Sequence, residues 1–269
     1  MTAELSRDEL FHVSINPDAE HTIVLLHGLL SSHLEYSFVI PHLNNYHLLI
    51  PDLPSHSRSA QIKPFSIELS SKCVSSLIEK HAHNRRAHVV GLSMGGFIAL
   101  DLAKRYPAQV SSLFMTGAAP LTGWKKWMAE RPSWVWSLMA GLLRNTPAWL
   151  YWKLCSWQGI KRHDELLVEM RANAQVELIS DCYSTILELN DDMPAPNIRA
   201  LTIAAGLQDD IESTRTMGQK LKETSSNNKA AVVKNAVHAW DLQSPELFAA
   251  GVQAWIEDRE LPEEFEMLE

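Results

Sequence analysis

The sequence predicts an α/β fold, in which a mainly parallel central sheet carries helices on both faces. Short apolar runs of strand length alternate with segments that have the apolar spacing of a helix, as in βαβ units. The apolar runs end in glycine, proline or other turn residues. One long segment, residues 121–195, interrupts this alternation because it contains no strand-like run.

The first half of the sheet is predicted from four apolar runs. Near-continuous apolar runs are typical of parallel strands that are buried on both faces. The expected strands lie near residues 10–15 and within HTIVLLHG (21–28), YHLLIPDLP (46–54) and AHVVGLS (87–93). Apolar residues at helical spacing predict helices over residues 66–82 and 94–107.

The second half of the sheet is predicted from three further runs. They lie within VSSLFMTGAAP (110–120), IRALTIAAG (198–206) and AAVVKNA (230–236). A helix is expected over residues 245–259, and the acidic tail LPEEFEMLE (261–269) is expected to be a solvated end.

The interrupting segment predicts a helical cap that covers the carboxyl ends of the strands. Pro132, Pro147 and Gly159 divide it into several expected helices. It is rich in tryptophan: Trp124, Trp127, Trp134, Trp136, Trp149, Trp152 and Trp157. We therefore expect residues 1–120 and 196–269 to form the core domain and residues 121–195 to form a tryptophan-rich cap subdomain.

Composition excludes several classes of partner. The formal net charge of -8 argues against nucleic acid, which is bound through Lys and Arg. The sequence has no run of about 18 apolar residues, the length that would predict a membrane span. Its first residues do not have the pattern of a secretory signal. The three cysteines have no zinc-ligand spacing. We expect a cytoplasmic protein without metal or organic cofactor, and the oligomeric state stays open.

A glycine-flanked serine marks the candidate site. Ser93 stands in the middle of Gly91-Leu92-Ser93-Met94-Gly95, between a predicted strand and a predicted helix. A strand-turn-helix of this pattern holds the serine in a strained conformation that exposes its hydroxyl. Strain at a serine has little purpose in a merely structural turn, so the pattern predicts a nucleophile.

A serine hydroxyl needs a base and a group that orients the base. His238 follows the last parallel strand, and Asp209 and Asp210 follow the strand before it, so all three are expected at the same edge of the sheet as Ser93. We favour Asp209 and leave Asp210 as the alternative. Asp241 is too close in sequence to His238 to orient it easily.

These motifs together resemble the α/β-hydrolase superfamily over nearly the whole chain. The resemblance rests on GLSMGG, on HG at 27–28, on DLPSHSRS at 52–59, on G-x-x-D at 206–209 and on VHAWDLQSPELF. It implies an oxyanion hole formed by the backbone N–H groups of Leu29 and Met94.

Two features depart from the family pattern. Ser55 and Ser57 stand where relatives commonly have glycine, which predicts a bulkier and less permissive loop. The region before residue 21 has room for one strand instead of two, so we expect a slightly trimmed sheet.

The tryptophans of the cap favour an apolar or aromatic small-molecule acyl substrate. We expect Trp124, Trp127, Trp149 and Trp152 to bind it. The leading hypothesis is a serine hydrolase that cleaves a small carboxylic ester or thioester through an acyl-enzyme. The alternatives are a hydrolase of a carbon-carbon bond in a diketone, a non-hydrolytic small-molecule receptor, and a biosynthetic isomerase or cyclase on the same fold.

Overall fold

An eight-stranded sheet forms the centre of the protein, in the order β1-β3-β2-β4-β5-β6-β7-β8. The computed structural model describes residues 9–131, 134–190, 193 and 196–269. The strands are β1 (His12–Ile15), β2 (Thr22–Leu26), β3 (His47–Pro51), β4 (Ala87–Leu92), β5 (Val110–Thr116), β6 (Ala200–Ala205), β7 (Lys229–Val233) and β8 (Phe265–Met267). Strands β2 to β7 pair in parallel, and the edge strands β1 and β8 pair antiparallel. The predicted α/β fold is therefore confirmed.

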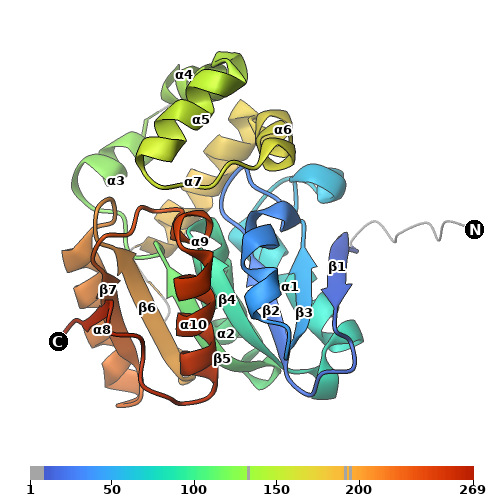
Figure 1. The fold of residues 1–269 in the computed structure, drawn as a ribbon, viewed down its shortest axis with the longest axis vertical. Coiled ribbons are helices and arrows are strands. Elements are labelled where there is room, and N and C mark those ends of the chain that lie inside the picture. The colour runs from blue at the N-terminus through green and yellow to red at the C-terminus, as the bar shows by residue number, and fades with distance from the viewer. Residues whose placement is uncertain (1–8, 132–133, 191–192, 194–195) are drawn as a thin grey trace, which may run out of the picture.

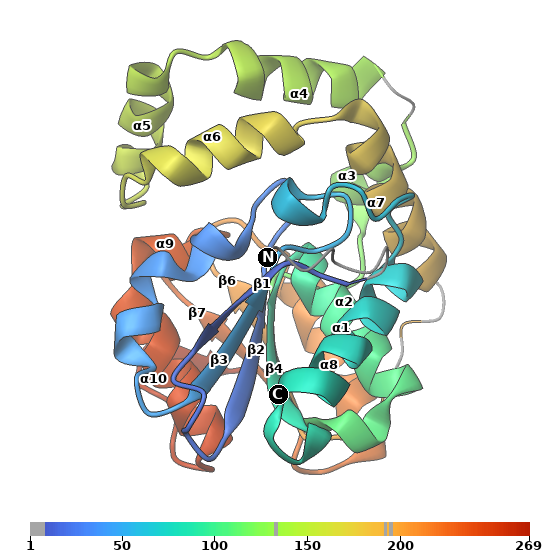
Figure 2. The ribbon, with the colours of Figure 1, turned by 90° about the vertical axis from the view of Figure 1, so that its right-hand side faces the viewer.

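Helices cover both faces of the sheet, as Figures 1 and 2 show. One face carries α1 (Ile67–His81), α2 (Met94–Arg105) and α8 (Ile211–Thr224). The other carries α9 (Trp240–Gln243), α10 (Pro245–Ile256) and the short 3-10 helices η1 (His33–Phe38) and η2 (Ile40–His42). Further 3-10 turns are η3 (Ser57–Ser59), η4 (His83–Arg85) and η5 (Pro107–Gln109). No helix within the described ranges is long and apolar enough to cross a membrane.

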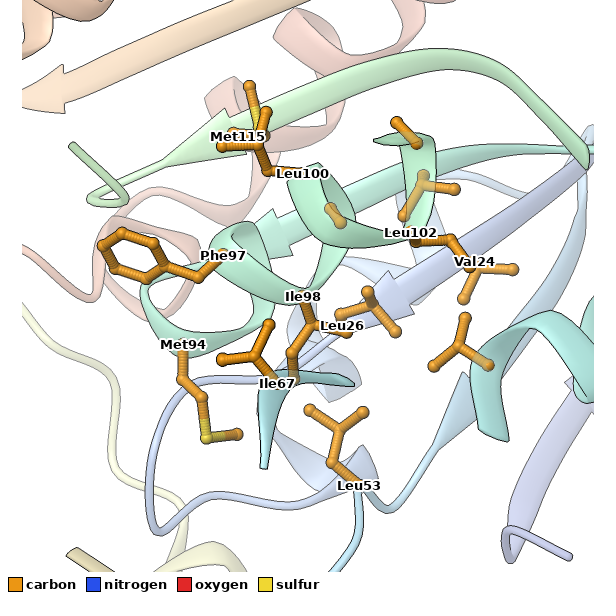
Figure 3. Packing of buried hydrophobic residues seen from close by; sticks show 14 of the residues in the cluster. Val24, Leu26, Leu53, Ile67, Met94, Phe97, Ile98, Leu100, Leu102 and Met115 are labelled. Carbon is orange, nitrogen blue, oxygen red and sulfur yellow. The ribbon is translucent and has the colours of Figure 1, made fainter. Parts of the chain in front are cut away.

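The sheet is buried because each face packs against a separate apolar cluster. On one face, Phe97 and Ile98 of α2 pack in the same cluster as Leu26 of β2 (Figure 3). On the other, the rings of Trp240 and Phe248 lie 4.6 Å apart between centroids. Burial of each such side chain contributes about 1.5–3 kcal/mol, so the two clusters fix the sheet between its helices.

The two ends of the sheet differ in how well the sequence predicts them. One strand, β1, precedes β2 among the described residues, in line with the expected trimming. The tail was expected to be solvated, and this is wrong, because β8 pairs antiparallel with β7. Phe265 is buried against the ring of Trp240, with centroids 5.8 Å apart, and Leu268 is buried as well. The apolar positions of the tail therefore outweigh its acidic composition.

Between β5 and β6 the chain forms helices, and the described part of residues 117–199 contains no strand. They are α3 (Gly123–Ala129), α4 (Trp134–Asn145), α5 (Ala148–Trp157), α6 (Asp164–Asn173) and α7 (Val176–Asn190), which we call the cap helices. In Figures 1 and 2, α4, α5 and α6 lie together at one end of the sheet. Pro147 precedes α5 and Gly159 follows it with φ +77°, whereas Pro132 lies outside the described residues.

The contact between α8 and β7 depends on the absence of a side chain at Gly218. A Cβ at this position would lie 2.3 Å from the Cβ of Ala230, whereas a Cβ at Gly141 of α4 would meet nothing within 4 Å. We expect Gly218→Ala to lower the free energy of unfolding by about 1–3 kcal/mol through overpacking. Gly141→Ala should raise it by up to about 1 kcal/mol, because alanine has the better helix propensity. Urea unfolding of both variants measures this, and equal stabilities would contradict it.

Candidate active site

The serine turn has the strained geometry that its sequence predicts. Ser93 lies between β4 and α2 with φ +53° and ψ −118°. Residues other than glycine rarely adopt this backbone conformation. Its backbone N–H donates to the carbonyl of Thr116 over 2.7 Å, which holds the turn against β5. A Cβ at Gly95 would lie 2.1 Å from the carbonyl oxygen of Leu26. The glycine is therefore required because α2 begins in direct contact with the end of β2.

Asp209 and His238 form a close pair at the ends of β6 and β7. The Nδ1–H of His238 donates to Oδ1 of Asp209 over 2.6 Å. The other carboxylate oxygen accepts the N–H of Ala205 over 2.9 Å. Burial disfavours ionisation of Asp209, but the hydrogen bond and charge of His238 and the Ala205 amide hold the pKa of the carboxyl below its ordinary value. Asp209 is thus an ionised hydrogen-bond acceptor for the imidazole.

Gly117, directly after β5, makes room for the imidazole, and sequence reasoning missed this residue. It has φ +65°, and a Cβ there would lie 2.4 Å from Cε1 of His238 and 3.3 Å from Oδ2 of Asp209. The available signal was a glycine at the end of a buried strand.

The other two aspartates have different surroundings. Asp210 caps α8, since its Oδ1 accepts the N–H of Ser213 over 3.0 Å and its Oδ2 accepts the hydroxyl of Thr122 over 2.7 Å. Asp241 is fully buried, and neither carboxylate oxygen has a hydrogen-bond partner within the described part of the chain. Asp209 is therefore the aspartate that contacts His238.

A cavity of about 700 Å³ joins the strand ends to the cap helices. The five residues expected as catalytic groups or in the oxyanion hole all line it: Leu29, Ser93, Met94, Asp209 and His238. The cap helices contribute mostly apolar side chains: Trp124, Met128, Trp136, Met139, Tyr183 and Ile186. The rings of Trp136 and Tyr183 are stacked, with centroids 4.4 Å apart. The space beside Ser93 thus suits an apolar or aromatic group.

The structure brings only one of the four expected substrate-binding tryptophans to the cavity. Trp124 lines it, whereas Trp127, Trp149 and Trp152 are not among its lining residues. Trp152 is buried and donates its Nε1–H to Asp164 over 2.8 Å, and the other two are exposed. Sequence reasoning instead missed Trp136 and Tyr183 as aromatic lining, because helical periodicity alone does not tell which face meets the cavity.

Two buried histidines fix the loop that follows β2. The Nδ1–H of His27 donates to the carbonyl of Gly28 over 2.8 Å, and its Nε2 accepts the N–H of Leu53 over 3.0 Å. His56 likewise donates to the carbonyl of Pro54 over 2.8 Å and accepts the N–H of Leu30 over 3.2 Å. Burial lowers the pKa of His27 to about 4 and that of His56 to about 3. Both rings are therefore neutral near pH 7, with one nitrogen donating and one accepting.

Glu35 lies beneath the same loop and was not foreseen as a site residue. Its Oε2 accepts the N–H of Gly28 over 2.7 Å. Burial raises the pKa of this carboxyl to about 7, although the Gly28 amide, the Ser31 hydroxyl and the charge of His238 act in the opposite direction. Burial and the neighbouring Glu35 also raise the pKa of Asp241. Two carboxyl groups thus lie buried close to the site.

Asn173, at the end of α6, ties the cap helices to this loop. Its Nδ2 donates to the carbonyls of Leu30 and Ser31 over 3.1 and 2.9 Å, and its Oδ1 accepts the N–H of Ser57 over 2.7 Å. Ser55 and Ser57, the two serines in glycine places, adopt φ +65° and +44°. Although serines replace the glycines of the family pattern, the loop keeps the backbone conformation that glycine favours. The hydrogen bonds of Asn173 stabilise this conformation.

The described residues contain no group of three or more His, Cys, Asp or Glu that could hold a metal ion.

Comparisons with known proteins identify relatives of the chain. A model of the alpha/beta hydrolase fold matches residues 21–151. An AB hydrolase superfamily protein of Gibberella zeae is 30% identical over 98% of this chain and 89% of its own length. A pimeloyl-[acyl-carrier protein] methyl ester esterase of Neisseria meningitidis is 24% identical over 90% of this chain and 95% of its own. Lipase 1 of Psychrobacter immobilis is 30% identical over 53% of this chain, which spans 43% of that protein.

Solved structures show the same fold. A thermophilic esterase from Thermogutta terrifontis superimposes with a TM-score of 0.68 and 18% identity, over 93% of both chains. An esterase from Exiguobacterium antarcticum superimposes with a TM-score of 0.72 and 15% identity, over 92% of this chain and 95% of its own. Since the Gibberella relative matches almost end to end, the chain belongs to the alpha/beta hydrolase superfamily.

Proposed function

We propose that this protein is a serine hydrolase that cleaves a small apolar or aromatic carboxylic ester or thioester. The observation that carries the proposal is the 2.6 Å contact of His238 with Asp209 at the cavity that Ser93 also lines. A strained serine, an imidazole and an ionised carboxylate are the three groups that acyl transfer to a hydroxyl requires.

In the proposed mechanism, the Oγ of Ser93 attacks the carbonyl carbon of the ester while Nε2 of His238 takes the hydroxyl proton. The carbonyl π electrons move to oxygen and form a tetrahedral oxyanion. When the oxyanion collapses, His238 returns the proton to the leaving alkoxide or thiolate, and the acyl group stays on Ser93. Water then repeats the cycle and releases the carboxylic acid. Asp209 holds the imidazole with Nδ1 protonated throughout.

The oxyanion is proposed to bind the backbone N–H groups of Leu29 and Met94. Both residues line the cavity next to Ser93, and neither amide has an acceptor among the described residues. Glu35 acts as a positioning residue in this proposal, because it holds the amide immediately before Leu29. A donor aimed at the oxyanion is worth about 3 kcal/mol of barrier, so the loop must be held firmly.

The cavity and the relatives support the proposed substrate class. The lining from α3, α4 and α7 is mostly apolar, which suits an acyl or aromatic group. The names of the relatives, a methyl ester esterase and a lipase, support cleavage of a carboxylic ester.

The nucleophile can be tested with a fluorophosphonate probe. We expect one probe molecule to attach per chain at Ser93, and Ser93→Ala to abolish the labelling and to lower ester turnover on the order of 10⁶-fold. Ser137→Ala, on the exposed side of α4, removes a serine without touching the cavity and should label like the wild type. Labelling that persists in Ser93→Ala would refute the proposed nucleophile.

The orienting aspartate can be tested with two matched variants. Asp209→Asn should lower kcat by about 10,000-fold, because an amide favours the wrong imidazole tautomer. Asp210→Asn should leave kcat and thermal stability near those of the wild type, because asparagine caps a helix about as well as aspartate. Steady-state kinetics on a short-chain p-nitrophenyl ester measures both. A large loss of kcat in Asp210→Asn alone would reverse the assignment.

The buried carboxyl of Glu35 should make stability depend on pH. Its pKa is about 7 in the folded protein and about 4.5 when exposed, so the unfolded chain releases this proton first as the pH rises. Its contribution to the free energy of unfolding is therefore full below about pH 4.5 and is lost towards pH 7. Glu35→Gln keeps an acceptor for the Gly28 amide and removes the titration.

Urea unfolding across this pH range should give a shallower decline of stability for Glu35→Gln than for the wild type. Glu212→Gln removes an exposed carboxyl of α8 and serves as the control. Identical slopes for Glu35→Gln and the wild type would show that Glu35 does not titrate in this range.

A further inference from the structure

The cap helices expose a large apolar surface away from the core. On α4, Trp134, Leu138 and Leu142 follow one another at the i, i+4, i+8 spacing of a single helix face, and each is about 60% exposed. We define the cap apolar face as these residues and the other exposed apolar side chains of α3 and α5: Trp124, Trp127, Trp134, Leu138, Leu142, Trp149, Leu154 and Trp157. The exposed apolar stripe on α4 is typical of an interaction site.

The packing of α4 shows that this face is not needed for the cap itself. The opposite side of the helix carries Val135, Trp136 and Ala140, which are buried in a cluster with Ile179 of α7. In Figures 1 and 2, α4 and α5 lie at the end of the molecule away from the base of the sheet. The exposed side of α4 therefore faces outward, and its burial would require something other than the core.

The charge of this region is opposite to that of the whole chain. Residues 121–162 contain seven Lys and Arg but a single acid, Glu130, whereas the chain has a formal net charge of -8. Arg144 of α4 and Lys153 of α5 are exposed and form no ion pair with a described residue. The segment that carries the cap apolar face is thus net positive on an otherwise acidic molecule, although Lys161 and Arg162 at its end pair with Glu246 and Asp164.

The cavity reaches the surface beside this face. Trp124 and Met139 both line the cavity. The exposed fraction is 67% for Trp124 and 43% for Met139. These two side chains belong both to the wall of the cavity and to the outer surface of the cap. A molecule held at the cap apolar face would therefore lie next to the cavity entrance.

We propose that the cap apolar face docks peripherally onto a lipid bilayer that contains anionic lipids. Tryptophan is favoured at the level of the headgroups, leucine below it, and Lys and Arg are attracted to anionic headgroups. With 12 residues, α4 is about 18 Å long, too short to span a bilayer and suited to lie in its surface. The acidic remainder of the molecule is repelled by the same surface, so the charge asymmetry also sets the orientation.

Charge complementarity favours a bilayer over a second copy of the chain. Two copies that met through this face would bring two cationic regions together, which costs free energy. An acidic protein partner would match the cations, but its polar surface would not cover the apolar stripe of α4. Docking also deepens the proposed function and in this respect rests on it: an apolar ester passes from the lipid into the cavity.

Binding to vesicles tests the docking without any catalysis. The full chain should sediment with vesicles of phosphatidylserine and phosphatidylcholine, and more weakly with phosphatidylcholine alone. Leu138→Gln/Leu142→Gln should lower the partition coefficient about tenfold or more. Arg144→Gln/Lys153→Gln should lower it about fivefold for each charge removed, and only on anionic vesicles. In about 1 M NaCl, where the Debye length is about 3 Å, the preference for anionic vesicles should disappear.

The controls separate docking from folding and from the proposed chemistry. Met267→Gln replaces an exposed apolar residue of β8 and should bind vesicles like the wild type. Turnover of a short soluble ester without lipid should be unchanged in Leu138→Gln/Leu142→Gln, which also shows that the variant folds. No turnover by the wild type, with vesicle binding intact, would refute the proposed function alone. Absence of binding, unchanged binding of the double Leu variant, or a wild-type dimer that this variant converts to monomer would each overturn the docking.

Discussion

The site depends on one close contact, in which the first turn of α2 touches the carboxyl end of β2 at Gly95. Because this position has no Cβ, the helix can begin against the carbonyl of Leu26, and the turn before it must take the strained conformation of Ser93. The same contact sets Ser93 beside the loop after β2, with Leu29 and Met94 on the wall of one cavity. The strain is tolerated because α2 is buried in the core along most of its length.

A second layer of buried polar groups holds the loop that faces Ser93. His27, His56 and Glu35 each hydrogen-bond to its backbone from within the core, and Asn173 does so from the cap. Buried polar groups are costly unless they are paired, so such a network stabilises one conformation of the loop and penalises others. The cap and the core are thereby coupled through the segment that we propose binds the oxyanion.

The sequence predicted the fold and the pair of Asp209 and His238 for the same reason. Apolar runs that end in turn residues locate the strand ends, and parallel strands bring their carboxyl ends to one edge. The network around Glu35 and Asn173 could not be predicted in this way, because neither residue follows a strand and both bind backbone groups, which carry no signal in the sequence. The tail was misjudged because its acidic composition hid the apolar positions that pair β8 with β7.

The cap shows the limit of periodicity most clearly. A helix that is apolar over most of its circumference is typical of a buried one, and α4, with the sequence WVWSLMAGLLRN, has apolar residues everywhere except on the side of Ser137, Gly141 and Arg144. In the structure one side, with Trp136, meets α7 and the cavity, and the other, with Leu138 and Leu142, meets solvent. Exposed apolar area costs about 25 cal/mol per Å² relative to burial. Burial of the outer side of α4 against a partner would therefore lower the free energy further. A partner that buries the outer side of α4 must also carry negative charge, because the surrounding segment is net positive. The interface of an anionic bilayer offers both an apolar interior and negatively charged headgroups.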